Sequence, residues 1–201
     1  MKSKVLHILA LIGFLAACEA NNVRELNIGP SILLLKPNGS DINFANASGD
    51  TISLSLISNQ HNQTELVPSG RLGNLGYDKI LAENRNYVMQ IDTPYYRFQY
   101  SFTTSLSGDN NESQVDQLSI AFSDAQGEFE NQFSIFYESE VYQLDPNLVI
   151  YLDSLNLISQ TYYDVYSPMN KSGDNRLFYY NVQNGIVGFI NSDNEVFERI
   201  N

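Results

Sequence analysis

The sequence predicts an all-β domain whose strands follow one another as an antiparallel meander. Apolar and polar residues alternate with a period of two in several segments, which is typical of half-buried strands. Short turn sequences of glycine, asparagine, aspartate and serine separate these segments. The chain has 13 tyrosines and 11 phenylalanines but no tryptophan, and aromatic side chains are enriched in strands. No segment carries a helical apolar stripe across three turns.

The strands are expected in chain order wherever apolar residues occupy every second position. These positions are Ile52, Leu54 and Leu56; Tyr96, Phe98, Tyr100 and Phe102; Leu118, Ile120 and Phe122; Phe133, Ile135 and Tyr137; and Leu148, Ile150 and Leu152. Asn38-Gly39 predicts a hairpin between strands at 32–36 and 42–45, because both residues tolerate positive φ. A meander of this kind closes as a β-sandwich, an up-and-down barrel or a curved half-barrel, and alternation fits all three.

The first eighteen residues predict secretion and lipid attachment. Two lysines precede an apolar run from Val5 to Phe14. A run of about ten residues suits the h-region of a signal peptide and is too short to cross a bilayer as a helix. The run ends in Leu15-Ala16-Ala17-Cys18, which resembles the bacterial lipobox. The resemblance implies cleavage before Cys18 and a membrane anchor of palmitate-type acyl chains on this cysteine.

The lipobox resemblance divides the chain into three parts. Residues 1–17 are the expected lipoprotein signal peptide, 18–27 a lipid-anchored polar tether, and 28–201 a single all-β domain. Cys18 is the only cysteine, so it has no partner for an internal disulfide or a metal-binding cysteine pair. The alternative is cleavage by ordinary signal peptidase, which leaves a free thiol. We expect a protein of the bacterial cell envelope, on the outer membrane, facing either the periplasm or the cell surface.

The domain is strongly acidic. Without the signal peptide, nine basic and 23 acidic side chains give a formal net charge of −14. No lysine or arginine occurs between Arg97 and Lys171, a span that holds eleven acidic residues. This charge excludes nucleic acid as a partner, because phosphate backbones are bound by basic surfaces. It serves solubility, or it forms an acidic face that binds divalent cations or a basic partner.

The C-terminal forty residues carry a second recognisable pattern. Tyrosine-rich segments at 162–166 and 178–181 are followed by Gly185-Ile186-Val187-Gly188-Phe189 and by a last strand at 195–200. The pattern resembles that of secreted Bacteroidota lipoproteins of unknown function. The resemblance implies a calycin-like or curved-sheet fold and brings no catalytic residues with it. The chain departs from the usual ending at Phe197, where tryptophan is common.

Two groups of residues are candidates for binding. The aromatic face formed by Tyr96, Phe98, Tyr100 and Phe102 either fills the core or lines a cavity for a ligand. The segment from Val67 to Asp78 is the longest weakly patterned stretch, and we expect it to be a functional loop.

Oxygen ligands cluster at one turn of the acidic span. Asp109, Asn111 and Glu112 are candidate calcium ligands, although ordinary turn chemistry also explains them and they do not follow the spacing of an EF-hand loop. Asp193 and Glu195 form a similar, smaller cluster. No other cofactor is expected.

Catalytic residues are scarce. His61 is expected at a polar hairpin tip, and no cysteine of the mature domain is available as a nucleophile other than the proposed anchor. The carboxylate pairs Glu128 with Glu130 and Glu138 with Glu140 each share a strand face by spacing. Two such acids suffice for a glycosidase, but alternating acids also protect exposed edge strands. We therefore predict that the protein is not an enzyme.

Three functions remain open on the sequence. The first is a lipid-anchored envelope domain that binds a small ligand, a glycan or a partner protein without catalysis. The second is a structural or assembly subunit whose acidic face docks a basic partner. The third is a carboxylate-based glycan hydrolase.

Overall fold

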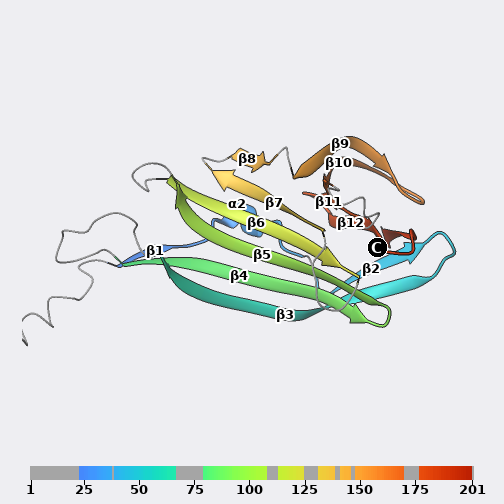
Figure 1. Ribbon diagram of the computed structural model, residues 1–201, viewed down its shortest axis with the longest axis horizontal. Helices are drawn as coiled ribbons and strands as arrows, with labels where there is room; N and C mark the ends of the chain where they lie inside the picture. The colour runs from blue at the N-terminus through green and yellow to red at the C-terminus, as the bar shows by residue number, and fades with distance from the viewer. Residues whose placement is uncertain are drawn as a thin grey trace, which may run out of the picture.

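The chain folds as an all-β domain (Figure 1), here in a computed structural model that describes residues 23–37, 39–66, 79–107, 113–124, 131–138, 141–145, 148–169 and 177–200. The elements in these residues are β1 (Val23–Leu26), α2 (Pro30–Leu33), β2 (Asp41–Asn46), β3 (Thr51–Leu66), β4 (Lys79–Asp92), β5 (Tyr95–Ser107), β6 (Ser113–Ser123), β7 (Asn131–Glu138), β8 (Val141–Leu144), β9 (Val149–Asn156), β10 (Thr161–Pro168), β11 (Leu177–Asn181), β12 (Gly185–Ile190) and β13 (Val196–Ile200).

The strands form one long antiparallel path. Each is hydrogen-bonded to the next in the order β8-β7-β6-β5-β4-β3-β2-β13-β12-β11-β10-β9, which confirms the predicted antiparallel meander. Two pairings depart from chain order: β13 lies beside β2, and β1 pairs in parallel with the start of β4. The sheet curves until β7 and β10, from its opposite halves, make contact. It is therefore nearly closed into a barrel, with β8 and β9 at its two edges.

Aromatic side chains from both halves of the sheet fill the interior. Phe189 of β12 lies at the centre and is fully buried. Its ring contacts five others at centroid distances of 4.9 to 5.7 Å, those of Phe44, Tyr96, Phe98, Phe122 and Phe197. Each such pair adds about 0.5–1.5 kcal/mol beyond the burial of its area. The ring of Phe189 thus connects β12 to β2, β5, β6 and β13.

The N-terminal segment enters this interior ahead of β2. Pro30 occupies the first turn of α2, where its fixed φ suits a helix start. Ile28, Ile32 and Leu35 are buried in the main core. Their spacing of three to four residues places them on one side of the segment. A single helical turn therefore packs against the inner face of the curved sheet.

Two buried carboxylates hold this segment. Glu83 of β4 accepts a hydrogen bond from the N–H of Ile28 at 2.8 Å. Asp116 of β6 accepts one from the next amide, that of Gly29, at 2.7 Å. Both side chains are less than 5% exposed, and a buried carboxylate needs such donors to offset its lost hydration. A Cβ at residue 29 would lie only 2.7 Å from Asp116 Oδ2, so a glycine permits this close contact.

Two parts of the predicted N-terminal organisation were wrong. The strand expected at 32–36 is instead α2 and the turn that follows it, because Ile32 and Leu35 pack with helical spacing. The tether expected at 18–27 ends earlier, since Val23–Leu26 form β1 and Leu26 is buried. No helix among the described residues has the length and apolar character needed to cross a membrane.

The strand predicted around Leu148, Ile150 and Leu152 forms as β9, but its faces are reversed at the start. Val149 is buried, whereas Leu148 and Ile150 are exposed. β9 is an edge strand with β10 as its partner in the sheet; Ile150 at its start is uncovered, whereas Leu152 farther along packs against the buried cluster of Val165 and Val187. Alternation correctly predicted the strand and failed to predict which face it buries.

Replacing the central ring tests this account of the core. We expect Phe189→Ala to lower the free energy of unfolding by about 3–5 kcal/mol, because it removes five ring contacts and leaves a cavity. Urea denaturation followed by circular dichroism measures this loss. Ile57→Ala, at a side chain 57% exposed, is the control and should change stability by less than about 0.5 kcal/mol. Equal effects of the two substitutions would contradict the packing described.

The hydrogen bond between the Glu83 carboxylate and the amide of Ile28 predicts that the stability of the fold depends on pH. Burial by itself raises the pKa of Glu83, but the amide of Ile28 and the guanidinium of Arg85 outweigh it and hold the pKa below its ordinary value of 4.5. The carboxylate therefore stabilises the fold above that value, and the contribution is lost as the pH falls through the lowered pKa. We expect Glu83→Gln to cost about 1.5–3 kcal/mol at neutral pH. Urea denaturation of both proteins should show this difference shrinking under acid conditions; a constant difference would contradict the role of ionisation.

Candidate functional site

The β9–β10 hairpin folds back over β12 and β13, on the face opposite the main core (Figure 1). Leu157, in the hairpin turn, packs so closely on Gly188 of β12 that a Cβ there would lie 2.6 Å from its Cδ1. Glu198 of β13 is buried and accepts hydrogen bonds from the N–H and hydroxyl of Ser159, both at 2.7 Å. It also accepts one from the N–H of Gln160 at 2.9 Å. Steric fit and a buried carboxylate thus fix the hairpin in place.

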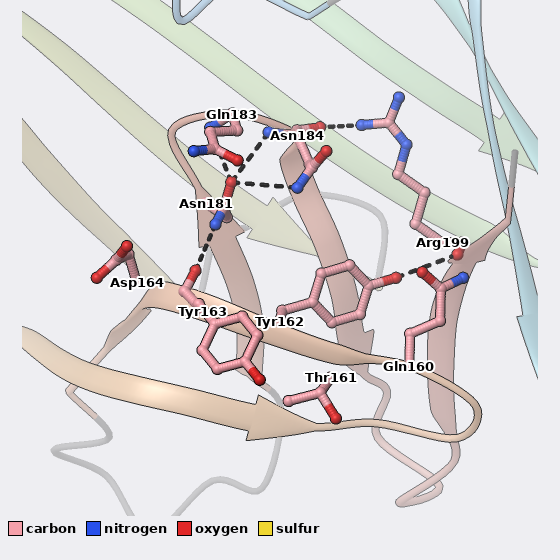
Figure 2. A pocket seen from close by; sticks show the side chains of 9 residues that line it. All are labelled: Gln160, Thr161, Tyr162, Tyr163, Asp164, Asn181, Gln183, Asn184 and Arg199. Carbon is pink, nitrogen blue, oxygen red and sulfur yellow. Dashed lines mark hydrogen bonds between the residues drawn. The ribbon is translucent and has the colours of Figure 1, made fainter.

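A cavity of about 380 Å³ opens between this hairpin, the β11–β12 turn and the end of β13 (Figure 2). We call it the hairpin pocket. Its volume falls within the range of about 300–1,000 Å³ that is usual for small-molecule sites. Nine residues line it: Gln160, Thr161, Tyr162, Tyr163, Asp164, Asn181, Gln183, Asn184 and Arg199.

Asn181 builds the wall formed by the β11–β12 turn. Its Oδ1 accepts hydrogen bonds from the N–H groups of Gln183 at 2.7 Å and Asn184 at 3.0 Å. Its Nδ2 donates to the carbonyl oxygen of Tyr163, which ties the turn to β10. Gly185 closes the turn at a φ of +76°, in the left-handed region that glycine adopts without strain. The buried side chain of Asn181 therefore holds the backbone of Gln183 and Asn184, whose side chains are exposed.

β13 supplies the opposite wall. The guanidinium of Arg199 donates from Nη1 to the carbonyl oxygen of Asn184. The hydroxyl of Tyr162 donates to the carbonyl oxygen of Arg199 at 3.4 Å. Burial, followed by the nearby carboxylate of Glu198, raises the pKa of Tyr162, so its hydroxyl keeps its proton at neutral pH. These contacts connect β10, β13 and the β11–β12 turn around the cavity (Figure 2).

Asp164 carries the one carboxylate of the lining. It has a φ of +53°, which an aspartate tolerates better than most residues. Its Oδ1 accepts a hydrogen bond from the hydroxyl of Tyr151, on β9, at 2.6 Å. This hydrogen bond, together with desolvation, raises the pKa of Tyr151 to about 12. The carboxylate is therefore held in one orientation while it stays exposed.

The lining groups are suited to hydrogen bonding. Apart from Asp164 and Arg199, the lining consists of phenol, hydroxyl and amide side chains. A glycosidase uses a pair of carboxylates that flank the scissile bond, and this lining has a single one. A nucleophile beside a general base is likewise not among the lining residues. The arrangement can hold a polar molecule by several hydrogen bonds at once.

The predicted aromatic face lies elsewhere and fills the core. Tyr96, Phe98, Tyr100 and Phe102 all point inward from β5 and are at most 5% exposed. Phe98 stacks on Phe122 at 4.7 Å, and burial raises the pKa of Tyr100 far above its usual range. These four side chains do not line the hairpin pocket. Of the two alternatives for this face, core packing is the one observed.

Several candidates lie outside the described residues. They are Cys18, the loop from Val67 to Asp78, the calcium candidates Asp109, Asn111 and Glu112, and the acids Glu128, Glu130 and Glu140. Within the described part of the chain, no group of three or more histidine, cysteine, aspartate or glutamate side chains is arranged to hold a metal ion. Asp193 and Glu195 belong to a turn organised by Asn191, whose Oδ1 accepts hydrogen bonds from the N–H groups of both.

His61 is not at a hairpin tip. It lies within β3, opposite Arg85 of β4, and its Nε2 is 2.8 Å from Glu83 Oε1. Arg85 donates to the same carboxylate oxygen at 2.6 Å. The turn was misplaced because the long polar run around His61 resembles a loop in composition, whereas β3 extends through it, paired with β4, which is itself paired with β5 on its other side. Both carboxylate oxygens of Glu83 therefore have partners in the structure, and this cluster helps to hold the N-terminal segment in place.

The hairpin pocket was missed by sequence reasoning. Asn184-Gly185 is an Asn-Gly pair, the strongest local hairpin signal, and it would have predicted the β11–β12 turn. The folding of the β9–β10 hairpin over Gly188 and Glu198 joins residues more than thirty positions apart. Such a contact leaves no local pattern, so the cavity that depends on it could not be foreseen.

The Tyr151–Asp164 contact gives a prediction about titration. We expect Asp164→Asn to return the pKa of Tyr151 from about 12 toward the ordinary value of 10, because the neutral amide no longer penalises the phenolate. Asparagine also tolerates the positive φ, so the fold should be kept. Carbon-13 NMR of labelled tyrosine ring carbons follows the titration. An unchanged pKa in the variant would show that the carboxylate does not control Tyr151.

Comparison of the chain with protein-family models, with curated proteins and with solved structures finds no match.

Proposed function

We propose that the protein is a non-enzymatic, lipid-anchored binding module of the bacterial cell envelope, which takes a small polar ligand in the hairpin pocket. The observation that carries this proposal is the cavity of about 380 Å³ with its polar lining. The lipobox at Leu15–Cys18 supports the anchor and the location.

The construction of the pocket supports a role in binding. Its walls come from β10, the β11–β12 turn and β13, and each is fixed by hydrogen bonds of buried groups, those of Asn181 and Glu198. A site that is formed before the ligand arrives avoids much of the entropic cost of ordering on binding. Six lining side chains remain exposed at the surface: Gln160, Thr161, Tyr163, Asp164, Gln183 and Asn184.

The proposal is tested by locating binding on the protein. The mature protein, labelled with nitrogen-15 and purified in detergent micelles, is titrated with maltotriose, trialanine, adenosine and octanoate in turn. We expect at least one of these compounds to shift the backbone amide signals of residues 160–164 and 181–184. Binding should be weakened by Asn181→Ala, which removes the hydrogen bonds that hold the β11–β12 turn.

The control for this titration is Asn84→Ala. Asn84 lies on β4, where its side chain bonds to Thr64 at 2.8 Å and does not reach the pocket. This variant should bind as the wild type does. If maltotriose, trialanine, adenosine and two further oligosaccharides, cellotriose and triacetylchitotriose, all leave the pocket signals unmoved, the proposed function is overturned.

A further inference from the structure

We infer that the ligand of the hairpin pocket is a carbohydrate. This inference rests on the proposed function and specifies the chemical class that the pocket recognises. A sugar ring offers two surfaces to a protein: a weakly polar face of C–H groups, and a rim of hydroxyls that both donate and accept hydrogen bonds. The lining of the pocket matches both.

Tyr163 provides the flat surface. Its side chain is 64% exposed, the most exposed aromatic residue of the described chain. Its backbone carbonyl is held by Asn181, so the Cα is fixed while the ring stays uncovered. Figure 2 shows this ring among the lining side chains, next to Thr161 and Tyr162. An exposed ring on a rigid backbone buries apolar area on binding at small entropic cost.

The amide side chains provide donors and acceptors together. Gln183 and Asn184 project from the turn that Asn181 holds, and Gln160 lies on the opposite side of the cavity mouth (Figure 2). A side-chain amide has an acceptor oxygen and two N–H donors; the Nδ2 of Asn184 also donates to Asn181 Oδ1 at 3.3 Å, which leaves this amide its oxygen and one N–H for a ligand. A sugar hydroxyl is also donor and acceptor at once, so neighbouring hydroxyls on a ring pair with amides in either direction. This versatility distinguishes the lining from a site for a purely anionic or purely cationic group.

Asp164 and the surface charge disfavour other ligand classes. The lining carries one carboxylate, that of Asp164, and one guanidinium, that of Arg199, whose Nη1 already bonds to the carbonyl oxygen of Asn184. The carboxylate accepts hydrogen bonds from hydroxyls, and the formal net charge of −14 on the mature chain disfavours a phosphate. An acyl chain would have to desolvate the amides and the carboxylate without giving them partners. Neutral, hydroxyl-rich molecules satisfy these groups.

Three oligosaccharides of different linkage and substitution test the inference: maltotriose, cellotriose and triacetylchitotriose. We expect at least one to bind the mature protein in micelles and to shift the pocket amide signals. Tyr163→Ala should then weaken binding roughly tenfold, since it removes the stacking surface. Tyr163→Phe keeps the ring and should stay within about threefold of the wild type.

Tyr142→Ala is the matched control. This tyrosine is 42% exposed on β8 and outside the pocket, so its loss should leave sugar binding unchanged. Thermal unfolding confirms that each variant is folded. If trialanine or adenosine shifts the pocket signals and the sugars do not, the carbohydrate inference is overturned and the binding function stands. If octanoate alone shifts them, the choice of a polar ligand is overturned as well. If a sugar binds equally well to Tyr163→Ala, the stacking role of this ring is overturned. If no compound binds, both proposals fall.

Discussion

The interior of a sheet that curves but does not fully close must be filled by the chain itself, and this requirement governs the structure. Aromatic rings from both halves meet around Phe189, and the N-terminal segment adds Ile28, Ile32 and Leu35, in and beside α2, to the apolar side chains of the strands. That segment is held by Glu83 and Asp116, which accept hydrogen bonds from two successive amides. The buried carboxylates thus fix the course of the backbone where apolar packing alone would leave it unspecified.

A third buried carboxylate, Glu198, holds a backbone segment in the same way on the outer face of the sheet. It accepts three hydrogen bonds from the turn of the β9–β10 hairpin and so keeps the hairpin against β12 and β13. The inner and outer faces of β12 are both covered as a result, the inner by Phe189 and its neighbours and the outer around Val187. The hairpin pocket is the space that remains between β10 of this hairpin, the β11–β12 turn and the end of β13.

The fold class could be predicted because strand alternation is a local property. The face with Tyr96 and Phe98 and the face with Leu118 and Phe122 follow the period of two along their whole length, and both are buried. Prediction failed where contacts between distant segments decide the outcome. The helical turn around Ile32 forms against strands more than fifty residues away, and Val149 is buried in the same cluster as side chains from the other half of the sheet. The pocket belongs to this second kind, since Arg199 reaches it from the last strand.

The pairing of β1 with β4 limits how far the domain can stand from a membrane. With Cys18 acylated as proposed, five Cα steps separate the anchor from Val23, a span of at most about 18 Å. Val23 is in register with Lys79 at one end of the long axis, and the β9–β10 hairpin lies toward the other end (Figure 1). So short a tether would keep the β1 end near the lipid headgroups, and the opposite end could extend away from them along the length of the domain. Attachment at the β1 end would then leave the hairpin pocket, at the opposite end, open to the space beyond the bilayer.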